Sequence, residues 1–315
     1  MNFDIISYKD LLDGENAFIR DKIKSALYMT GIVGVCDVPA FVETSKDYIE
    51  AVRKFSALDM ASKKQYEPNR DAGLTEGYEV GAEQFLDQNG QWQTDDKKAS
   101  FYAFVPDHPR NIWPREVDLK TPYLALGELM FETGKKVLDF LGLNEAVGLH
   151  LDDMVGYGRM LHYLNVDESQ NANPNWCGAH LDHGVFTALM PAYYFREGIE
   201  VEEPEEAGLY IMPSNSDQFE KINARDKSIM LFQVGEFLQL ASNDQILATK
   251  HLVRKAKGNI ERYTYALFFS AHDDTVIYPH SKLTKDTRYL EQKSPDGSIS
   301  YGKWEAASYE LYRAR

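Results

Sequence analysis

The 315-residue chain has little cysteine, few basic residues and no long apolar run. Its two cysteines, Cys36 and Cys177, cannot form a disulfide framework or a four-thiolate zinc site, so a reducing compartment is the default expectation. No window approaches roughly 18 uninterrupted apolar residues, which excludes an ordinary transmembrane helix. The first residues carry an acid where a signal peptide has a base. We therefore expect a cytoplasmic protein without a membrane partner.

The shortage of positive charge is also informative. Lys and Arg number 34 against 49 Asp and Glu, a formal net charge of −15. A general affinity for nucleic acid or anionic membrane needs clustered Lys and Arg, so neither is expected as a partner. What the chain has in quantity is apolar surface: 43% hydrophobic and 12% aromatic residues, which is enough for a sizeable core.

The first 154 residues are predicted to form a mainly helical region that supports the β core. Apolar spacing predicts strands over 3–6 and 32–38, and helices over 15–29, 41–62 and 121–141. Between about 66 and 120 the chain is rich in Gly, Pro, Asp, Asn and aromatic residues, which is typical of surface loops with a few short strands.

From about residue 155 to 280 the pattern changes to short apolar or alternating segments separated by Asn, Asp, Gly and Pro. Such spacing is typical of an all-β sandwich or barrel. Length at about 150 residues per domain suggests two domains, but no linker divides the halves. We predict one domain, 1–315, with a β core at 155–280 and a C-terminal extension at 281–315. An acidic run is expected to be a solvated loop: Glu200, Glu202, Glu203, Glu205 and Glu206.

Three residues form a candidate metal site. His180 and Asp182 are two apart in an apparent strand, so both side chains would project from one face. His251 begins a later strand-like segment and could add a third ligand from a neighbouring strand. Two histidines and one carboxylate on one side of a metal make the facial triad of non-haem Fe(II) oxygenases. By itself H-x-D is a weak signal, because a histidine in a β-rich core is more often simply hydrogen-bonded there.

A second group points to an anion site. Arg262 and Thr264 alternate onto one face of an otherwise apolar strand, and Tyr163 could add a phenol from another strand. A buried guanidinium is costly unless it meets an anion, and its rigid donor fork matches a carboxylate. The alternatives are that Arg262 pairs with an internal Asp or Glu, or reaches the surface.

The ordered combination of these segments resembles a known family. The stretches HLDHG (180–184), VGEFLQLASNDQILATKHLVRKA (234–256) and ERYTYALFF (261–269) are similar to the isopenicillin N synthase-like branch of the Fe(II)/2-oxoglutarate-dependent oxygenases. RMLHYL, ALYMTGIVGV and LDFLGL extend the resemblance upstream, so that it covers roughly residues 3 to 280. It implies a double-stranded β-helix (jelly-roll, cupin-like) core, mainly β, with surrounding helices and a helical N-terminal portion.

The resemblance also assigns roles to residues. It implies that His180, Asp182 and His251 bind Fe(II) and carry the catalysis, and that Arg262 and Thr264 bind the distal carboxylate of 2-oxoglutarate with help from Tyr163. Two features depart from the family pattern. Leu161 stands where plant members often have a cosubstrate-contacting Asn, and the 68 residues between Asp182 and His251 exceed the usual spacing. The excess falls near residues 193–206, as an insertion near the pocket mouth.

Three functional hypotheses remain open from the sequence. The first is a dioxygenase that couples decarboxylation of 2-oxoglutarate to succinate with hydroxylation or other C–H oxidation of a small molecule. The second is an iron-dependent oxidase of the same fold, of the oxidative cyclase type, that uses no 2-oxoglutarate. The third is a non-catalytic binding protein on this fold, because fold does not determine function. The pocket wall is expected to include the region 78–102, Phe186 and Phe268, which suggests a small, partly apolar substrate.

Overall fold

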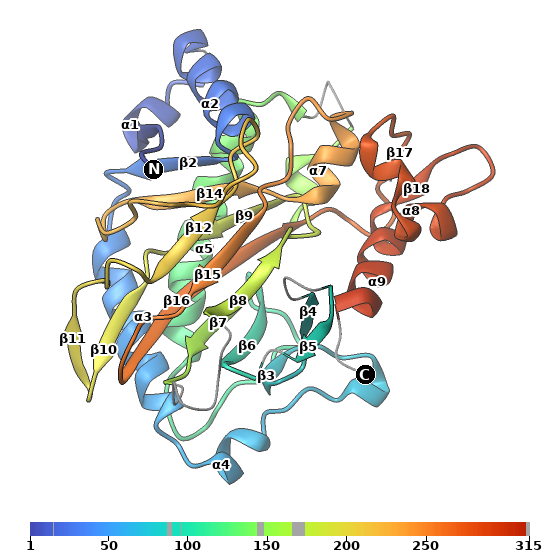
Figure 1. Ribbon diagram of the computed structural model, residues 1–315. Coiled ribbons are helices and arrows are strands. Elements are labelled where there is room, and N and C mark those ends of the chain that lie inside the picture. Colours follow the sequence, from blue (N-terminus) through green and yellow to red (C-terminus); the bar gives the residue numbers. More distant parts are fainter. Residues whose placement is uncertain (15, 87–89, 95, 144–147, 166–173, 313–315) are drawn as a thin grey trace.

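Two β-sheets pack face to face in the computed structural model (Figure 1), which describes residues 1–14, 16–86, 90–94, 96–143, 148–165 and 174–312. Within these residues the larger sheet has ten strands in the order β1-β2-β14-β9-β16-β7-β6-β3, with β10 and β11 attached beside β16. The smaller sheet has the order β13-β12-β15-β8. Apolar side chains from both sheets meet between them, which is the packing of a β-sandwich.

The bounds of the elements are as follows. The larger sheet contains β1 (Ile5–Ser7), β2 (Ile32–Cys36), β3 (Gly77–Val80), β6 (Lys98–Val105), β7 (Val155–Tyr163), β9 (Phe186–Leu189), β10 (Tyr193–Arg196), β11 (Ile199–Val201), β14 (Met230–Val234) and β16 (Ile260–Ser270). The smaller sheet contains β8 (Asn175–His180), β12 (Gly208–Ile211), β13 (Glu220–Lys221) and β15 (His251–Arg254). Two further sheets have two strands each: β4 (Gln84–Leu86) with β5 (Trp92–Thr94), and β17 (Val276–Ile277) with β18 (Ile299–Ser300).

The helices are α1 (Tyr8–Leu11), α2 (Ala17–Met29), α3 (Phe41–Ser56), α4 (Met60–Lys64), α5 (Lys120–Asp139), α7 (Glu236–Ala241), α8 (Thr287–Gln292) and α9 (Tyr301–Tyr312). Short 3₁₀ turns lie at Arg70–Ala72, Leu151–Asp153 and Lys282–Lys285. In the described part of the chain, no helix combines the length and apolarity needed to cross a membrane.

Alternation along β16 gives the larger sheet two chemically different faces. Tyr265, Leu267 and Phe269 project outward into the core formed with α3 and α5, where Tyr48 of α3 meets the ring of Tyr265 edge-on at 5.0 Å. The alternate residues of β16 face the smaller sheet instead, because successive side chains of a strand point to opposite faces. The inner face is therefore where the polar residues of β16 meet the candidate metal ligands.

Most predicted N-terminal elements are confirmed with small shifts of their bounds. The expected helix over 41–62 is divided, because α3 ends at Ser56 and Asp59 begins α4 by accepting a hydrogen bond from the Ser62 backbone N–H. The region 66–120 is more ordered than predicted, since β6 is an eight-residue strand of the larger sheet, paired between β7 and the edge strand β3. The division into one domain stays a prediction.

The prediction of a solvated acidic run is correct for four of the five glutamates. Glu200, Glu202, Glu205 and Glu206 are exposed around β11 and the loop after it. Glu203 is the exception: only 7% of its side chain is exposed, and it points inward, where it forms an ion pair with Lys221 at 2.8 Å. The prediction was wrong for Glu203 because a run of acidic residues does not show which of them turns inward to pair with a lysine from a distant segment.

Replacing Gly134 by alanine tests the contact between α5 and the larger sheet. Alanine in a helix is normally more stable than glycine by about 0.5–1 kcal/mol. At Gly134, however, a Cβ would lie 2.2 Å from Cζ of Phe269 and 3.0 Å from Cε1 of Phe232. We expect Gly134→Ala to lower the free energy of unfolding by about 1–3 kcal/mol, measured by urea denaturation, because overpacking forces the rings apart.

The control is Gly14→Ala, where a Cβ would meet no atom within 4 Å. It should leave the urea midpoint unchanged. A higher midpoint for Gly134→Ala than for the wild type would contradict the close packing of α5 on β16.

Candidate functional site

The three predicted metal ligands converge at the edge of the smaller sheet. β8 ends at His180, β15 begins at His251, and the antiparallel register sets these two residues opposite each other. Asp182 Oδ1 lies 3.7 Å from His180 Nε2 and 3.8 Å from His251 Nε2. One ligand atom from each residue falls within 4.8 Å of the others, so a single cation could be bound by all three.

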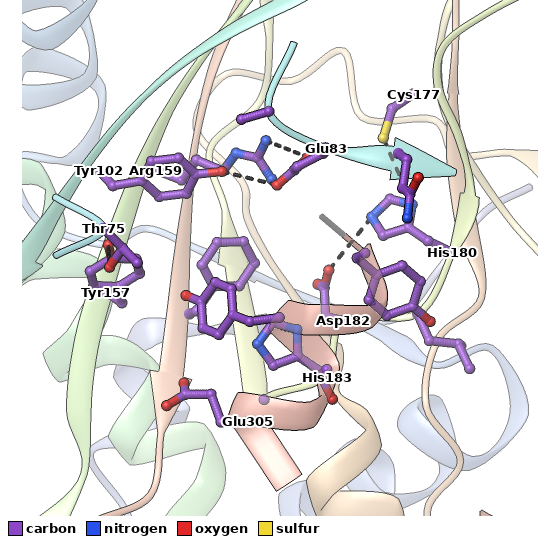
Figure 2. A pocket seen from close by; sticks show the side chains of 18 of the residues that line it. Thr75, Glu83, Tyr102, Tyr157, Arg159, Cys177, His180, Asp182, His183 and Glu305 are labelled. Carbon is purple, nitrogen blue, oxygen red and sulfur yellow. Dashed lines mark hydrogen bonds and ion pairs between the residues drawn. The ribbon is translucent and has the colours of Figure 1, made fainter. Parts of the chain in front are cut away.

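The convergence of His180 and Asp182 has a different cause from the one predicted. The strand stops at His180, and Asp182 lies in the loop that follows it, so strand alternation does not orient the carboxylate. Asp182 is instead held from the larger sheet: its Oδ2 accepts hydrogen bonds from Thr187 Oγ1 and Gln233 Nε2, both at 2.7 Å. This leaves Oδ1 directed at the two imidazoles (Figure 2 shows Asp182 and His180).

Backbone carbonyls orient both imidazole rings. Nδ1 of His180 lies 2.9 Å from the Gly178 carbonyl oxygen, and Nδ1 of His251 lies 2.9 Å from that of Thr249. A carbonyl can only accept, so each Nδ1 carries a proton, and each Nε2 is turned toward Asp182. Such outer partners are usual for metal-bound histidines, because they set the tautomer and the ring orientation.

The electrostatics of the three residues suit a cation. Burial lowers the pKa of His251 to about 4, so its imidazole is neutral near pH 7 and its nitrogen is available as a ligand. Burial by itself would raise the pKa of Asp182, but His251, His180 and the two hydrogen-bond donors outweigh it and lower the pKa. The site therefore offers two imidazole nitrogens and one carboxylate, which is the donor set of the facial triad.

A small cavity of about 70 Å³ extends from the triad between the two sheets to Arg262. Arg262 is buried on the inner face of β16, and its Nε donates to the hydroxyl of Tyr194 at 3.2 Å. Among the described residues, Nη1 of Arg262 is a buried donor without a hydrogen-bond partner. An unsatisfied guanidinium N–H in a closed cavity is costly, and a ligand carboxylate would satisfy it.

Tyr163 and Thr264 both line this cavity, as predicted, but their contacts differ from those expected. The Tyr163 ring lies against the Arg262 guanidinium, 4.7 Å from ring centre to Cζ, so its face rather than its hydroxyl meets the cation. The Thr264 hydroxyl donates to the Met190 carbonyl, which occupies its only proton. The roles of Arg262, Thr264 and Tyr163 toward a cosubstrate stay predictions.

Sequence reasoning missed the residues that orient Arg262. The Tyr194 hydroxyl accepts from Arg262 and donates to Glu203 Oε2 at 3.1 Å, and Glu203 in turn pairs with Lys221. The sequence left open a direct ion pair between Arg262 and an internal acid. Arg262 is instead linked to the acid Glu203 through the Tyr194 hydroxyl. Tyr194 lies on β10, whose register sets it opposite Arg262, and only the strand pairing brings the two together.

A larger cavity of about 240 Å³ opens on the other side of His180 and Asp182. Phe268 and Tyr102 line it, as expected for the pocket wall, whereas Phe186 is buried in the outer core and does not. Residues 87–89 and 95 of the predicted wall lie outside the described residues. His183 lies in the loop rather than on a strand, lines the same cavity and stacks edge-on against Tyr309.

The C-terminal extension closes this larger cavity, which the sequence did not predict. Helix α9 contributes one side of its surface to the lining: Tyr301, Glu305, Ser308, Tyr309 and Tyr312. The spacing of these residues at three and four positions is a helical signal, but it does not reveal what the helix packs against.

The chain was compared with known proteins by sequence and by structure. No family model matches the chain. The sequence is 24% identical over 314 residues to 1-aminocyclopropane-1-carboxylate oxidase homolog 9 of Arabidopsis thaliana, covering 93% of this chain and 78% of that protein.

Solved structures extend the comparison. A 2OG-Fe(II) oxygenase family protein from Caulobacter crescentus superposes with a TM-score of 0.71 at 19% identity, covering 98% of this chain and 98% of that one. JOX2 in complex with 2OG, Fe and JA superposes with a TM-score of 0.68 at 15% identity, covering 100% and 90%. The predicted fold class, mainly β with surrounding helices, is confirmed, although the sheets formed by the described residues do not close into a barrel. The chain thus has the double-stranded β-helix fold of the Fe(II)/2-oxoglutarate-dependent oxygenases, as its sequence motifs indicate.

Proposed function

We propose that this protein is an Fe(II)- and 2-oxoglutarate-dependent dioxygenase that oxidises a C–H bond of a small organic molecule. The observation that carries the proposal is the position of the His180–Asp182–His251 triad, which lies where two cavities meet. One cavity ends at a buried guanidinium and suits a dicarboxylate cosubstrate. The other is larger and opens beside His180 and Asp182, where a substrate would lie.

His180, Asp182 and His251 would hold the iron. They leave the remaining coordination positions open, because the described surroundings of the triad offer no fourth His, Cys, Asp or Glu within the same cluster. Bound Fe(II) supplies dioxygen activation, coupled to oxidative decarboxylation of 2-oxoglutarate to succinate and carbon dioxide. The chain's own part is positioning: Arg262 binds the distal carboxylate, and the apolar side chains between the sheets exclude water from the small cavity.

The separation of the cavities favours this function over an oxidase whose substrate itself ligates the metal. In that alternative Arg262 would bind the substrate's carboxylate, and substrate would have to fill the small cavity of about 70 Å³. The larger cavity would then have no ligand to bind. A cytoplasmic location remains a prediction from the composition.

Binding and turnover of 2-oxoglutarate test the proposal directly. Under anaerobic conditions the protein should bind 2-oxoglutarate in an Fe(II)-dependent manner, measured by titration calorimetry, and admission of oxygen should release succinate. Arg262→Gln should weaken 2-oxoglutarate binding by about 10- to 100-fold, because a hydrogen bond to a charged group contributes about 1.5–3 kcal/mol. Binding of iron without binding of 2-oxoglutarate would support the oxidase instead.

Removing one ligand tests the metal site. His180→Ala should weaken Fe(II) binding by more than about 100-fold, since loss of even an outer partner of a metal ligand costs about 10–100-fold. The matched control is His272→Ala, because this side chain is 61% exposed and follows the end of β16, outside both cavities. If His180→Ala binds Fe(II) as the wild type does, the triad is not the metal site, and the hypothesis of a non-catalytic binding protein gains support.

The phenol that orients Arg262 can be tested in the same assay. Tyr194→Phe removes the acceptor of the Arg262 Nε–H and should weaken 2-oxoglutarate binding by about tenfold, the effect of one hydrogen bond. Fe(II) binding should not change. Tyr210→Phe is the control, because its hydroxyl donates only to the Glu206 carbonyl at 3.0 Å, outside both cavities. Equal affinities in Tyr194→Phe and wild type would remove Tyr194 from the cosubstrate site.

A further inference from the structure

Three hydrogen-bond donors converge on one carboxylate in the wall of the larger cavity. Arg159 Nη2 and Lys98 Nζ each lie 2.8 Å from Glu83 Oε2, and the Tyr102 hydroxyl donates to Glu83 Oε1 at 3.0 Å. Figure 2 shows Arg159, Tyr102 and Glu83 in contact, above Asp182 and beside His180. Arg159, Lys98 and Tyr102 thus form a carboxylate receptor, which holds the chain's own Glu83 carboxylate.

The donors stand on long strands of the larger sheet, whereas Glu83 lies in a β-bridge just before the short strand β4. Arg159 on β7 and Tyr102 on β6 are direct neighbours in the register, and Lys98 projects from the same face of β6. The side chains of Lys98 and Arg159 are 5% and 11% exposed, while that of Glu83 is 33% exposed and precedes the short strand β4. Two nearly buried cations thus share one partly exposed carboxylate.

The other charged residues in the described lining of the larger cavity have partners of their own. Apart from the triad and its neighbour His183, these residues are Arg70, Glu79 and Glu305. Arg70 and Glu79 pair with each other, and burial raises the pKa of Glu305, whose carboxyl accepts from the Tyr301 hydroxyl at 2.9 Å.

The receptor lies beside the candidate metal site, where the two cavities meet. Arg159 and Lys98 line both cavities, together with His180, Asp182 and Phe268. A molecule whose carboxylate met Arg159 would therefore extend past the triad. Several aromatic side chains line the wall, with Trp92, Tyr157 and Tyr309 added to Tyr102 and Phe268. The rings of Tyr102 and Tyr157 stack with their centres 5.7 Å apart.

The size of the cavity limits the ligand. Pockets for drug-sized ligands measure about 300–1,000 Å³, so a cavity of about 240 Å³ suits a smaller molecule. Aromatic walls favour a planar apolar body, because flat rings stack with little loss of conformational freedom.

We propose that the substrate is a small aromatic monocarboxylate whose carboxylate binds Arg159 and Lys98 in place of Glu83. This inference rests on the proposed oxygenase function, since it assigns the substrate of the same site. Glu83 then acts as an internal competitor, neutralising the two cations until a substrate carboxylate replaces it.

Matched acids and amides test the charge requirement. The probes are benzoate, phenylacetate and cinnamate, each compared with its primary amide, titrated anaerobically into the protein loaded with Fe(II) and 2-oxoglutarate. At least one acid should bind about tenfold or more tightly than its amide, the effect expected for a charge-assisted hydrogen bond. Oxygen-dependent succinate release should rise with that acid and not with its amide.

Two variants separate a receptor from a structural tether. Glu83→Gln removes the competing charge but keeps the shape of the side chain, so it should tighten binding of the acid by several-fold. If Glu83 serves only to anchor β4, the same change loosens the wall and weakens binding. Arg159→Gln should abolish the preference for the acid over the amide. Arg20→Gln, which removes one positive charge from the exposed face of α2, is the control. It should change neither the affinity for the acid nor the preference for the acid over its amide.

Loading with Fe(II) and 2-oxoglutarate is verified first for each variant, so a failure of the oxygenase proposal is seen before any acid is added. If the wild type does not load, the acids are titrated into the metal-free protein, where the Arg159 receptor predicts the same preference. Equal binding of acid and amide, weaker acid binding by Glu83→Gln, or no binding of any acid at millimolar concentration would each overturn the inference.

Discussion

The antiparallel pairing of β8 with β15 is the constraint on which the site depends. It sets His251 opposite His180, so the last residue of one strand and the first of the next present their imidazoles side by side. A register shift of one residue would turn one imidazole to the opposite face and separate the ligands. Thr249, just before β15, resists such a shift: its hydroxyl accepts from the Val234 backbone N–H and donates to the Gly31 carbonyl, while its own carbonyl orients His251.

The larger sheet supplies the hydrogen bonds that hold Asp182 and also the residues of the proposed anion site. Thr187 of β9 and Gln233 of β14 hold the Asp182 carboxylate, although Asp182 itself lies beyond the end of β8. Alternation along β16 sends Arg262 and Thr264 inward and Tyr265 outward against α3 and α5. The candidate metal ligands and the residues of the proposed anion site therefore come from different parts of the fold, and the packing of the two sheets sets the distance between them.

The two cavities differ in chemistry because different elements close them. The small cavity lies between the sheets, and the link from Lys221 through Glu203 and Tyr194 keeps Arg262 turned toward it. The larger cavity is completed by α9 and by the segment that carries Glu83. In the proposed arrangement Arg159 and Lys98 select a ligand by its negative charge, and Glu83 neutralises them until a substrate carboxylate replaces it.

The sequence by itself determined the β-rich core and the long helix α5, and it picked out the candidate triad, because periodicity and ordered motifs are local properties of the chain. It also singled out Arg262, since a cation in an apolar strand is conspicuous without any structure. Only the tertiary structure decided which residues surround these groups. Tyr194, Glu203, Arg159 and α9 reach the site through strand pairing and helix packing between distant segments, and no local pattern encodes such contacts. The prediction that Glu203 is solvated was wrong for the same reason: whether one glutamate of an acidic run is buried depends on a lysine eighteen residues later, which only the folded chain brings near.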